Sequence, residues 1–78
     1  MTDKELLDCV TAFDIPVKDG KLQVDKCGLG GHWTVYSTAL ESTLRRDGEW
    51  DDFATDLGPE GPYAFRSYQD ALRTAGVI

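Results

Sequence analysis

The chain has 78 residues, of which 41% are hydrophobic and 10% aromatic, and its 14 acidic and 8 basic residues give a formal net charge of −6 at pH 7. This length predicts a single domain over residues 1–78 with a small core, and the apolar content argues against a disordered chain. The negative charge argues against binding to nucleic acids or anionic membranes. The sequence has no apolar run of about 18 residues, so a transmembrane helix is not predicted. Because the first residues are polar and acidic, unlike a signal peptide, we expect a cytoplasmic protein.

The N-terminal residues predict an amphipathic helix over residues 3–13. Thr2 and Glu5 match a capping box, in which the two side chains satisfy backbone amides of the first turn. Four apolar residues follow at helical spacing: Leu6, Cys9, Val10 and Phe13. Pro16 cannot continue this helix, because proline lacks the backbone donor.

A hairpin is predicted after this helix. Residues 15–17 and 22–24 are apolar at alternate positions, as expected for strands, and they flank a short polar segment. The pair Asp19-Gly20 within that segment favours a tight turn that needs positive φ. We therefore expect the two strands to be antiparallel neighbours.

A further strand is predicted at residues 32–37, after a glycine-rich turn at residues 27–31. Its alternation places Trp33 and Val35 on one face of the sheet. Residues 63–65 (Tyr-Ala-Phe) are expected to add an edge strand. Together these segments predict an antiparallel sheet of three to four strands.

Two short helices are predicted in the acidic segment between those strands. Thr38 and Glu41 match a second capping box, and Gly48 is placed to end the helix that follows. Residues 50–57 have helical periodicity and end at Gly58-Pro59. Their apolar positions are Trp50, Phe53, Ala54 and Leu57, which we expect to face inward, with Phe53 and Leu57 needed for core packing.

The C-terminal residues predict a further amphipathic helix. Ser67 is a favourable N-cap, Asp70 suits the positive end of the helix dipole, and Gly76 ends the helix. One apolar face is formed by Tyr68, Ala71, Leu72 and Ala75. The expected fold is therefore α+β: a small three- to four-stranded antiparallel sheet packed by an N-terminal and a C-terminal helix, with short helical turns in the acidic segment.

No motif in the sequence predicts an enzyme, a cofactor or a metal site. His32 is the single histidine, and no nucleophile motif accompanies it, so we expect it at the surface. Cys9 and Cys27 lack the close ligand pairs of a zinc site, and we expect two reduced thiols rather than a disulfide. The glycines of residues 27–31 lack the spacing of a phosphate-binding loop, which favours a flexible turn.

The acidic excess is concentrated in residues 41–60, where seven acidic and two basic residues give a net charge of −5. A surface of this kind is suited to a basic partner, although acidic residues also serve solubility alone. Trp50, between charged residues, is the aromatic side chain best placed to reach a partner. The candidate partner-binding residues are Asp47, Glu49, Trp50, Asp51, Asp52, Asp56 and Glu60.

Over about residues 33–76 the chain resembles several anti-CRISPR proteins, which are small proteins of phages and other mobile elements. The resemblance rests on the aromatic strand WTVY at residues 33–36, the acidic loop, and the sequence YAFRS at residues 63–67 leading into a helix with Asp70 and Ala71. It implies a non-enzymatic inhibitor of a nucleic-acid-handling effector complex, such as a CRISPR–Cas component. The acidic face would block a basic nucleic-acid-binding surface by imitating phosphates, without binding nucleic acid itself.

An alternative function is a structural or regulatory accessory protein that acts through protein–protein contacts. In that case the contacts would come from the sheet around Trp33 and Tyr36, or from a strand edge. We expect the protein to be a monomer or a weak homodimer.

Overall fold

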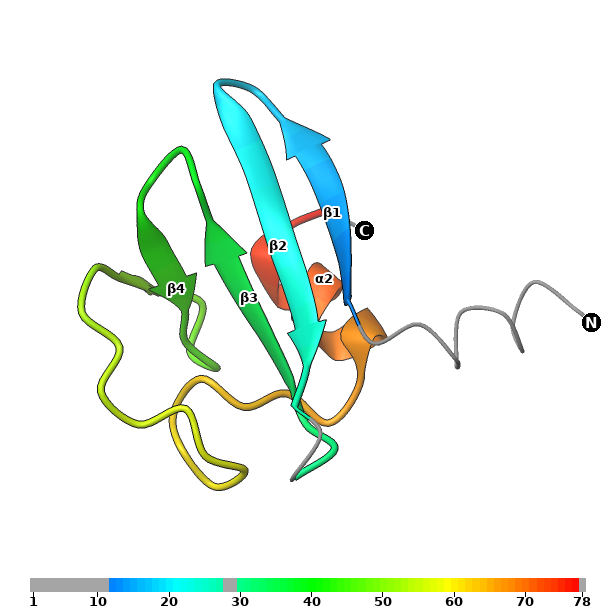
Figure 1. The fold of residues 1–78 in the computed structure, drawn as a ribbon, viewed down its shortest axis with the longest axis vertical. Coiled ribbons are helices and arrows are strands. Elements are labelled where there is room, and N and C mark those ends of the chain that lie inside the picture. Colours follow the sequence, from blue (N-terminus) through cyan, green and yellow to red (C-terminus); the bar gives the residue numbers. More distant parts are fainter. Residues whose placement is uncertain (1–11, 28–29, 78) are drawn as a thin grey trace, which may run out of the picture.

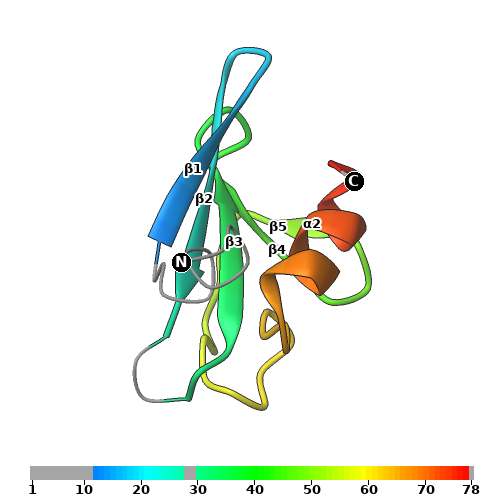
Figure 2. The same cartoon turned by 90° about the vertical axis from the view of Figure 1, so that its right-hand side faces the viewer.

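The computed structural model describes residues 12–27 and 30–77. These residues form a five-stranded antiparallel sheet in the order β1-β2-β3-β4-β5, with one helix, α2, on one face (Figures 1 and 2). Each strand is bonded to its neighbour in the sequence, so the sheet is a simple meander. The strands are β1 (Ala12–Val17), β2 (Gly20–Lys26), β3 (Trp33–Ser37), β4 (Ser42–Leu44) and β5 (Trp50–Asp51), and α2 is Tyr68–Ala75.

The predicted hairpin is confirmed and is formed by β1 and β2. Val17 pairs with Gly20, which leaves Lys18 and Asp19 as the turn, and Asp19 takes the positive φ of 70°. Asp tolerates this conformation better than most residues, because its short side chain can bond locally. Gly20 begins β2 at a close approach, since an added Cβ would lie 2.6 Å from the hydroxyl oxygen of Thr38.

The predicted strand at residues 32–37 is also confirmed, as β3, and it lies at the centre of the sheet. Val35 pairs with Val24 of β2, and both side chains are fully buried. Tyr36 is exposed on the opposite face, as the alternation of a strand requires. The face that carries Val24 and Val35 is the one that α2 covers.

The short helix predicted at residues 38–48 is wrong, because this segment forms a turn and then β4. The Thr38 hydroxyl accepts from the Lys21 amide at 2.9 Å, and the Thr38 amide donates to the Lys21 carbonyl at 2.9 Å. Thr38 therefore binds β2 rather than capping a helix. Glu41 has a positive φ of 52°, which is incompatible with a right-handed helix.

The second short helix, predicted at residues 50–57, is also wrong. Trp50 and Asp51 form β5, where Trp50 pairs with Leu44 and Asp51 pairs with Thr43. Residues 52–62 then follow an irregular path without a helix or a strand (Figure 1). A periodicity of a few apolar residues does not determine a helix this short, because such helices depend on packing.

The edge strand predicted at residues 63–65 is reduced to a single bridge between Phe65 and Trp33. The two residues exchange both backbone hydrogen bonds, at 2.8 and 2.9 Å. The backbone carbonyl of the neighbouring His32 instead accepts from the Cys27 amide, on the side of β3 that faces β2. Phe65 therefore lies on the same edge of β3 as β4, beyond the point where β4 ends.

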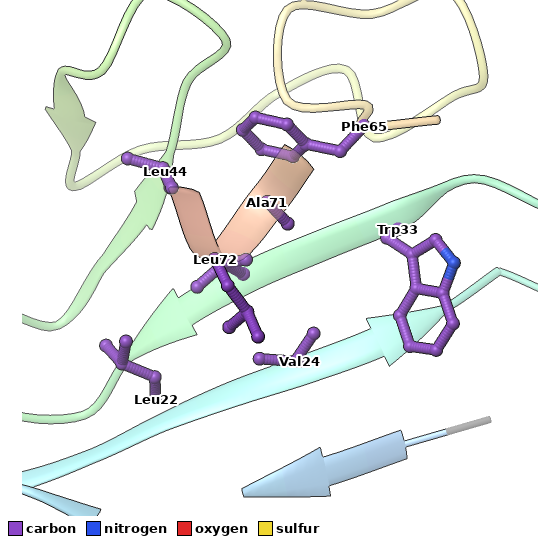
Figure 3. Close-up of a cluster of buried hydrophobic side chains, with 8 residues drawn as sticks. Leu22, Val24, Trp33, Leu44, Phe65, Ala71 and Leu72 are labelled. Carbon is purple, nitrogen blue, oxygen red and sulfur yellow. The ribbon is translucent and has the colours of Figure 1, made fainter. Parts of the chain in front are cut away.

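The C-terminal helix is confirmed as α2, with the predicted caps. The Ser67 hydroxyl accepts from the Asp70 amide, and Gly76 takes a left-handed conformation with φ of 81°. Ala71 and Leu72 are its buried residues, and they face the sheet (Figure 3). The core consists of Leu22, Val24, Trp33, Val35, Leu44, Phe65, Ala71 and Leu72.

The predicted helix at residues 3–13 is wrong at its end, because Ala12 and Phe13 begin β1; residues 3–11 lie outside the described residues. The Phe13 ring contacts the rings of Trp33 and Tyr68, each with a centroid distance of 6.0 Å. Such contacts favour the strand over a local helical preference. Within the described residues the sheet has five strands and α2 alone packs on it, so the predicted three- to four-stranded sheet packed by an N-terminal and a C-terminal helix is wrong.

The described residues contain no helix with the length and apolar character needed to cross a membrane.

Candidate partner-binding surface

The predicted partner-binding residues lie in the turn between β4 and β5, in β5, and in the irregular loop that follows. The β4–β5 turn is closed by hydrogen bonds from the Arg45 amide to the Glu49 carbonyl at 2.8 Å and from the Gly48 amide to the Arg45 carbonyl at 3.0 Å. Gly48 has a φ of 90°, a conformation that glycine adopts without strain. The acidic residues are therefore presented by a turn and a loop, rather than by the outer faces of two helices.

Three of the predicted acids shape this backbone by the same local contact. Asp47, Asp51 and Asp56 each accept a hydrogen bond from the amide two residues later, at 3.0, 3.0 and 3.1 Å. This contact is the Asx turn, in which the side chain replaces a backbone carbonyl. These three carboxylates hold the segment in its path, and their loss would affect structure as well as charge.

Asp51 has the most contacts of the three. Its Oδ2 accepts from the hydroxyl of Tyr63 at 2.5 Å, and a guanidinium nitrogen of Arg45 lies 3.9 Å away. The Tyr63 hydrogen bond, followed by the Phe53 amide, lowers the pKa of Asp51, and the same bond raises the pKa of Tyr63. Tyr63 is 2% exposed, so this hydrogen bond joins Asp51 to the buried part of the protein. The carboxylate of Asp51 is therefore less available to a partner.

Asp47 is exposed but also paired. The amide of Glu49 and the guanidinium of Arg45, 3.3 Å away, lower the pKa of Asp47. The same carboxylate raises the pKa of Arg45. A partner that uses Asp47 must therefore compete with Arg45 for it.

Glu49, Asp52 and Glu60 are exposed, and none forms a side-chain hydrogen bond or an ion pair with another described residue. Trp50 is half-buried against the core, so its indole contributes to packing more than to the surface. Of the predicted set, the three unpaired acids are the most available for a partner.

Two apolar residues of this loop were predicted to pack inward and do not. Phe53 is 76% exposed and Leu57 is 51% exposed. A helix would have placed both beside Trp50, but the chain leaves β5 as a loop and turns them outward. The signal for this in the sequence is the pair Asp51-Asp52 before Phe53, which is as typical of an Asx turn as of a helix start.

His32 is buried, contrary to the prediction that it lies at the surface, and is 5% exposed. Its Nε2 donates to the Leu57 carbonyl at 2.7 Å, because a carbonyl oxygen can only accept. Nδ1 is buried and has no hydrogen-bond partner among the described residues; it faces Gly30. His32 thus links Leu57, in the loop of residues 52–62, to the start of β3.

The possible metal ligands are scattered over the part of the chain that the structure describes. No three side chains of the His, Cys, Asp or Glu type converge there in a way that could hold a metal ion. Cys27 is a half-buried free thiol, and Cys9 lies outside the described residues.

No protein-family model, curated protein or solved structure matches this chain.

Proposed function

We propose that the protein is a non-enzymatic inhibitor that binds a basic surface of a nucleic-acid-handling effector complex, in the manner of anti-CRISPR proteins. The binding surface combines the unpaired carboxylates of Glu49 and Asp52 with the exposed ring of Phe53 and the side chain of Leu57. The acidic residues match the positive charge that such an effector presents to phosphates. An effector of this kind acts in the cytoplasm, which is the location proposed for this protein.

The observation that carries the proposal is the exposure of Phe53. A ring that is 76% exposed leaves apolar surface in water, and a partner that covers this surface gains the free energy of burying it. Aromatic residues are common among the side chains that dominate binding energy, and charged neighbours orient the approach of the partner. Phe53 follows Asp52 directly, so an apolar contact and a charged contact occur side by side.

A panel of purified CRISPR–Cas effector complexes tests the proposal through binding and nucleic-acid cleavage. The protein is expected to bind one effector and inhibit its cleavage, with affinity that falls as the NaCl concentration rises. The pair Glu49→Gln with Asp52→Asn should weaken binding, and so should Phe53→Ala. A matched pair, Asp19→Asn with Asp25→Asn, removes the same charge from the β1–β2 hairpin and should bind as the wild type does.

Two results would contradict the proposal. Binding that is equally weakened by the matched pair would reflect total charge rather than a surface. Binding that is indifferent to salt and to all of these substitutions would place the interface elsewhere.

A second candidate function, the accessory role, is favoured by the face of the sheet opposite α2. Tyr36 is exposed there, and within the described residues no helix covers this face (Figure 2). Trp33 cannot take part, because it is 5% exposed in the core. Light scattering after size-exclusion chromatography tests this role: a dimer that Tyr36→Asp dissociates would support it, and a monomer at all concentrations would oppose self-association.

A further inference from the structure

A hollow with unpaired arginines lies beside the acidic loop. It has a volume of about 540 Å³, and its lining includes Arg46, Arg66, His32, Glu60, Ala64 and Phe65. We call it the Arg46–Arg66 hollow. A smaller hollow of about 240 Å³, toward α2, is lined by the same two arginines.

The two arginines differ from the others that the structure describes. Arg45 is paired with Asp47 at 3.3 Å, and Arg73 is paired with Asp70 at 3.3 Å. Arg46 and Arg66 form no ion pair within residues 12–27 and 30–77. Two exposed guanidinium groups at one hollow, neither in an ion pair with a described residue, are free to bind another negative group.

Both arginines are held by fixed backbone. The Arg46 amide donates to the Pro62 carbonyl at 2.8 Å, which joins the β4–β5 turn to the end of the loop. Arg66 follows Phe65 directly, and Phe65 is bonded to Trp33 of β3. The positions of the two Cα atoms are therefore set by the sheet, which lowers the cost of bringing both side chains onto one ligand.

His32 forms part of the wall of the hollow. It is 95% buried in the wall of the hollow, and its Nδ1 has no hydrogen-bond partner among the described residues. Because Nε2 donates to the Leu57 carbonyl, Nδ1 of the neutral ring is an acceptor, which does not attract an anion. A Cβ at Gly30 would lie 2.5 Å from Nδ1, so Gly30 packs against this nitrogen, and His32 shapes the wall of the hollow without binding the ligand.

We propose that the Arg46–Arg66 hollow binds a small anionic ligand through a phosphate or carboxylate group. The planar guanidinium group presents paired N–H donors that match both anions, and two of them can hold one oxyanion from two sides. The apolar surface of Ala64 and Phe65 suits a ligand with a small apolar or aromatic body. Glu60, the one acidic residue among the described residues that line the hollow, opposes binding and limits its strength. This site is separate from the proposed contact with an effector, which uses Phe53 and its neighbouring carboxylates.

Titrations of the full chain with phenyl phosphate, benzoate and benzyl alcohol, followed by ¹H–¹⁵N NMR at constant ionic strength, test the proposal. Phenyl phosphate or benzoate should give saturable shifts at Gly31, His32 and Ala64, and comparison of the two identifies the preferred group. Benzyl alcohol, which lacks the charge, should give none. Arg66→Gln should weaken binding about tenfold or more, as expected when a hydrogen bond to a charged group is lost.

Two further variants keep the result interpretable. Glu60→Gln removes the opposing charge and should tighten binding without removing a ligand-binding group. Lys18→Gln removes the same charge as Arg66→Gln, but from the β1–β2 turn, and should leave binding unchanged. Equal binding of benzyl alcohol, shifts spread over all basic residues, or no effect of Arg66→Gln would each overturn the proposal.

Discussion

Comparing the stability lost in Phe53→Ala with that lost in Phe65→Ala tests whether the Phe53 ring lies at the surface and the Phe65 ring in the core. The sequence predicts that Phe53 packs in the core, but Phe53 is 76% exposed, whereas Phe65 is 5% exposed. About a quarter of the Phe53 side chain is buried, and full burial contributes about 1.5–3 kcal/mol, so Phe53→Ala should cost about 0.4–0.8 kcal/mol. Phe65→Ala leaves a cavity and should cost about 3–5 kcal/mol.

Thermal unfolding followed by far-ultraviolet circular dichroism measures both variants. For a domain of this size, about 1 kcal/mol shifts Tm by about 4–8 °C. Phe53→Ala should therefore lower Tm by about 2–6 °C, and Phe65→Ala by about 12 °C or more. If the two variants lose the same stability, the Phe53 ring is packed in solution, and it cannot serve as a contact for a partner.

Three further changes test the N-cap of α2, the close approach at Gly61, and the hydrogen bond between Tyr63 and Asp51. Ser67→Ala removes the N-cap of α2 and should cost about 1 kcal/mol in urea unfolding. Gly61→Ala places a Cβ against the Asp56 carbonyl and should cost about 1–3 kcal/mol by the same measurement, because the loop must shift. Tyr63→Phe removes the hydrogen bond that lowers the pKa of Asp51 below 3.8. The stability contributed by ionised Asp51 is complete above 3.8 and is lost as the pH falls through the lower folded pKa. The fall in Tm on acidification should therefore be smaller in the variant than in the wild type.

Each of these changes has a control. Gly58→Ala meets its nearest atom, Oδ1 of Asp56, at 3.2 Å and should cost less than Gly61→Ala; an equal cost would contradict the close approach at Gly61. Ser67→Asp keeps a capping acceptor and should retain stability. An acid-side fall in Tm that is the same in Tyr63→Phe and in the wild type would show that Asp51 does not depend on the tyrosine.

The parts of the fold that the sequence predicts are those set by local chemistry. Asp19 and Gly20 determine the β1–β2 hairpin, and Ser67 and Gly76 determine the limits of α2. These residues act through their own backbone or that of near neighbours. A single sequence contains the information for such contacts.

The segment after β3 was predicted wrongly because distant contacts determine it. Thr38 matches a helix cap, but its hydroxyl and amide bond to Lys21 of β2 instead. Asp51 matches a helix start, but it is held by Tyr63 from a later segment. His32 was expected outside, and the carbonyl that accepts its hydrogen bond belongs to Leu57. None of these pairings is visible in the spacing of the residues.

The same reasoning accounts for the candidate site. The concentration of acidic residues located the loop, but only the structure separates the carboxylates with structural contacts from the unpaired Glu49, Asp52 and Glu60. Phe53 is exposed although its apolar ring favours burial, and no local pattern in the sequence predicts this exposure.

The order of the strands determines how the chain folds as well as its final shape. In a meander every strand pairs with the strand just before it, so most contacts join residues that are near in sequence, and such sheets fold faster than sheets that pair distant strands. The bridge between Trp33 and Phe65 is different, because its formation closes the long segment that contains β4, β5 and the acidic loop. We therefore expect the sheet to form early and this one closure to complete folding, with the acidic loop fixed in place last.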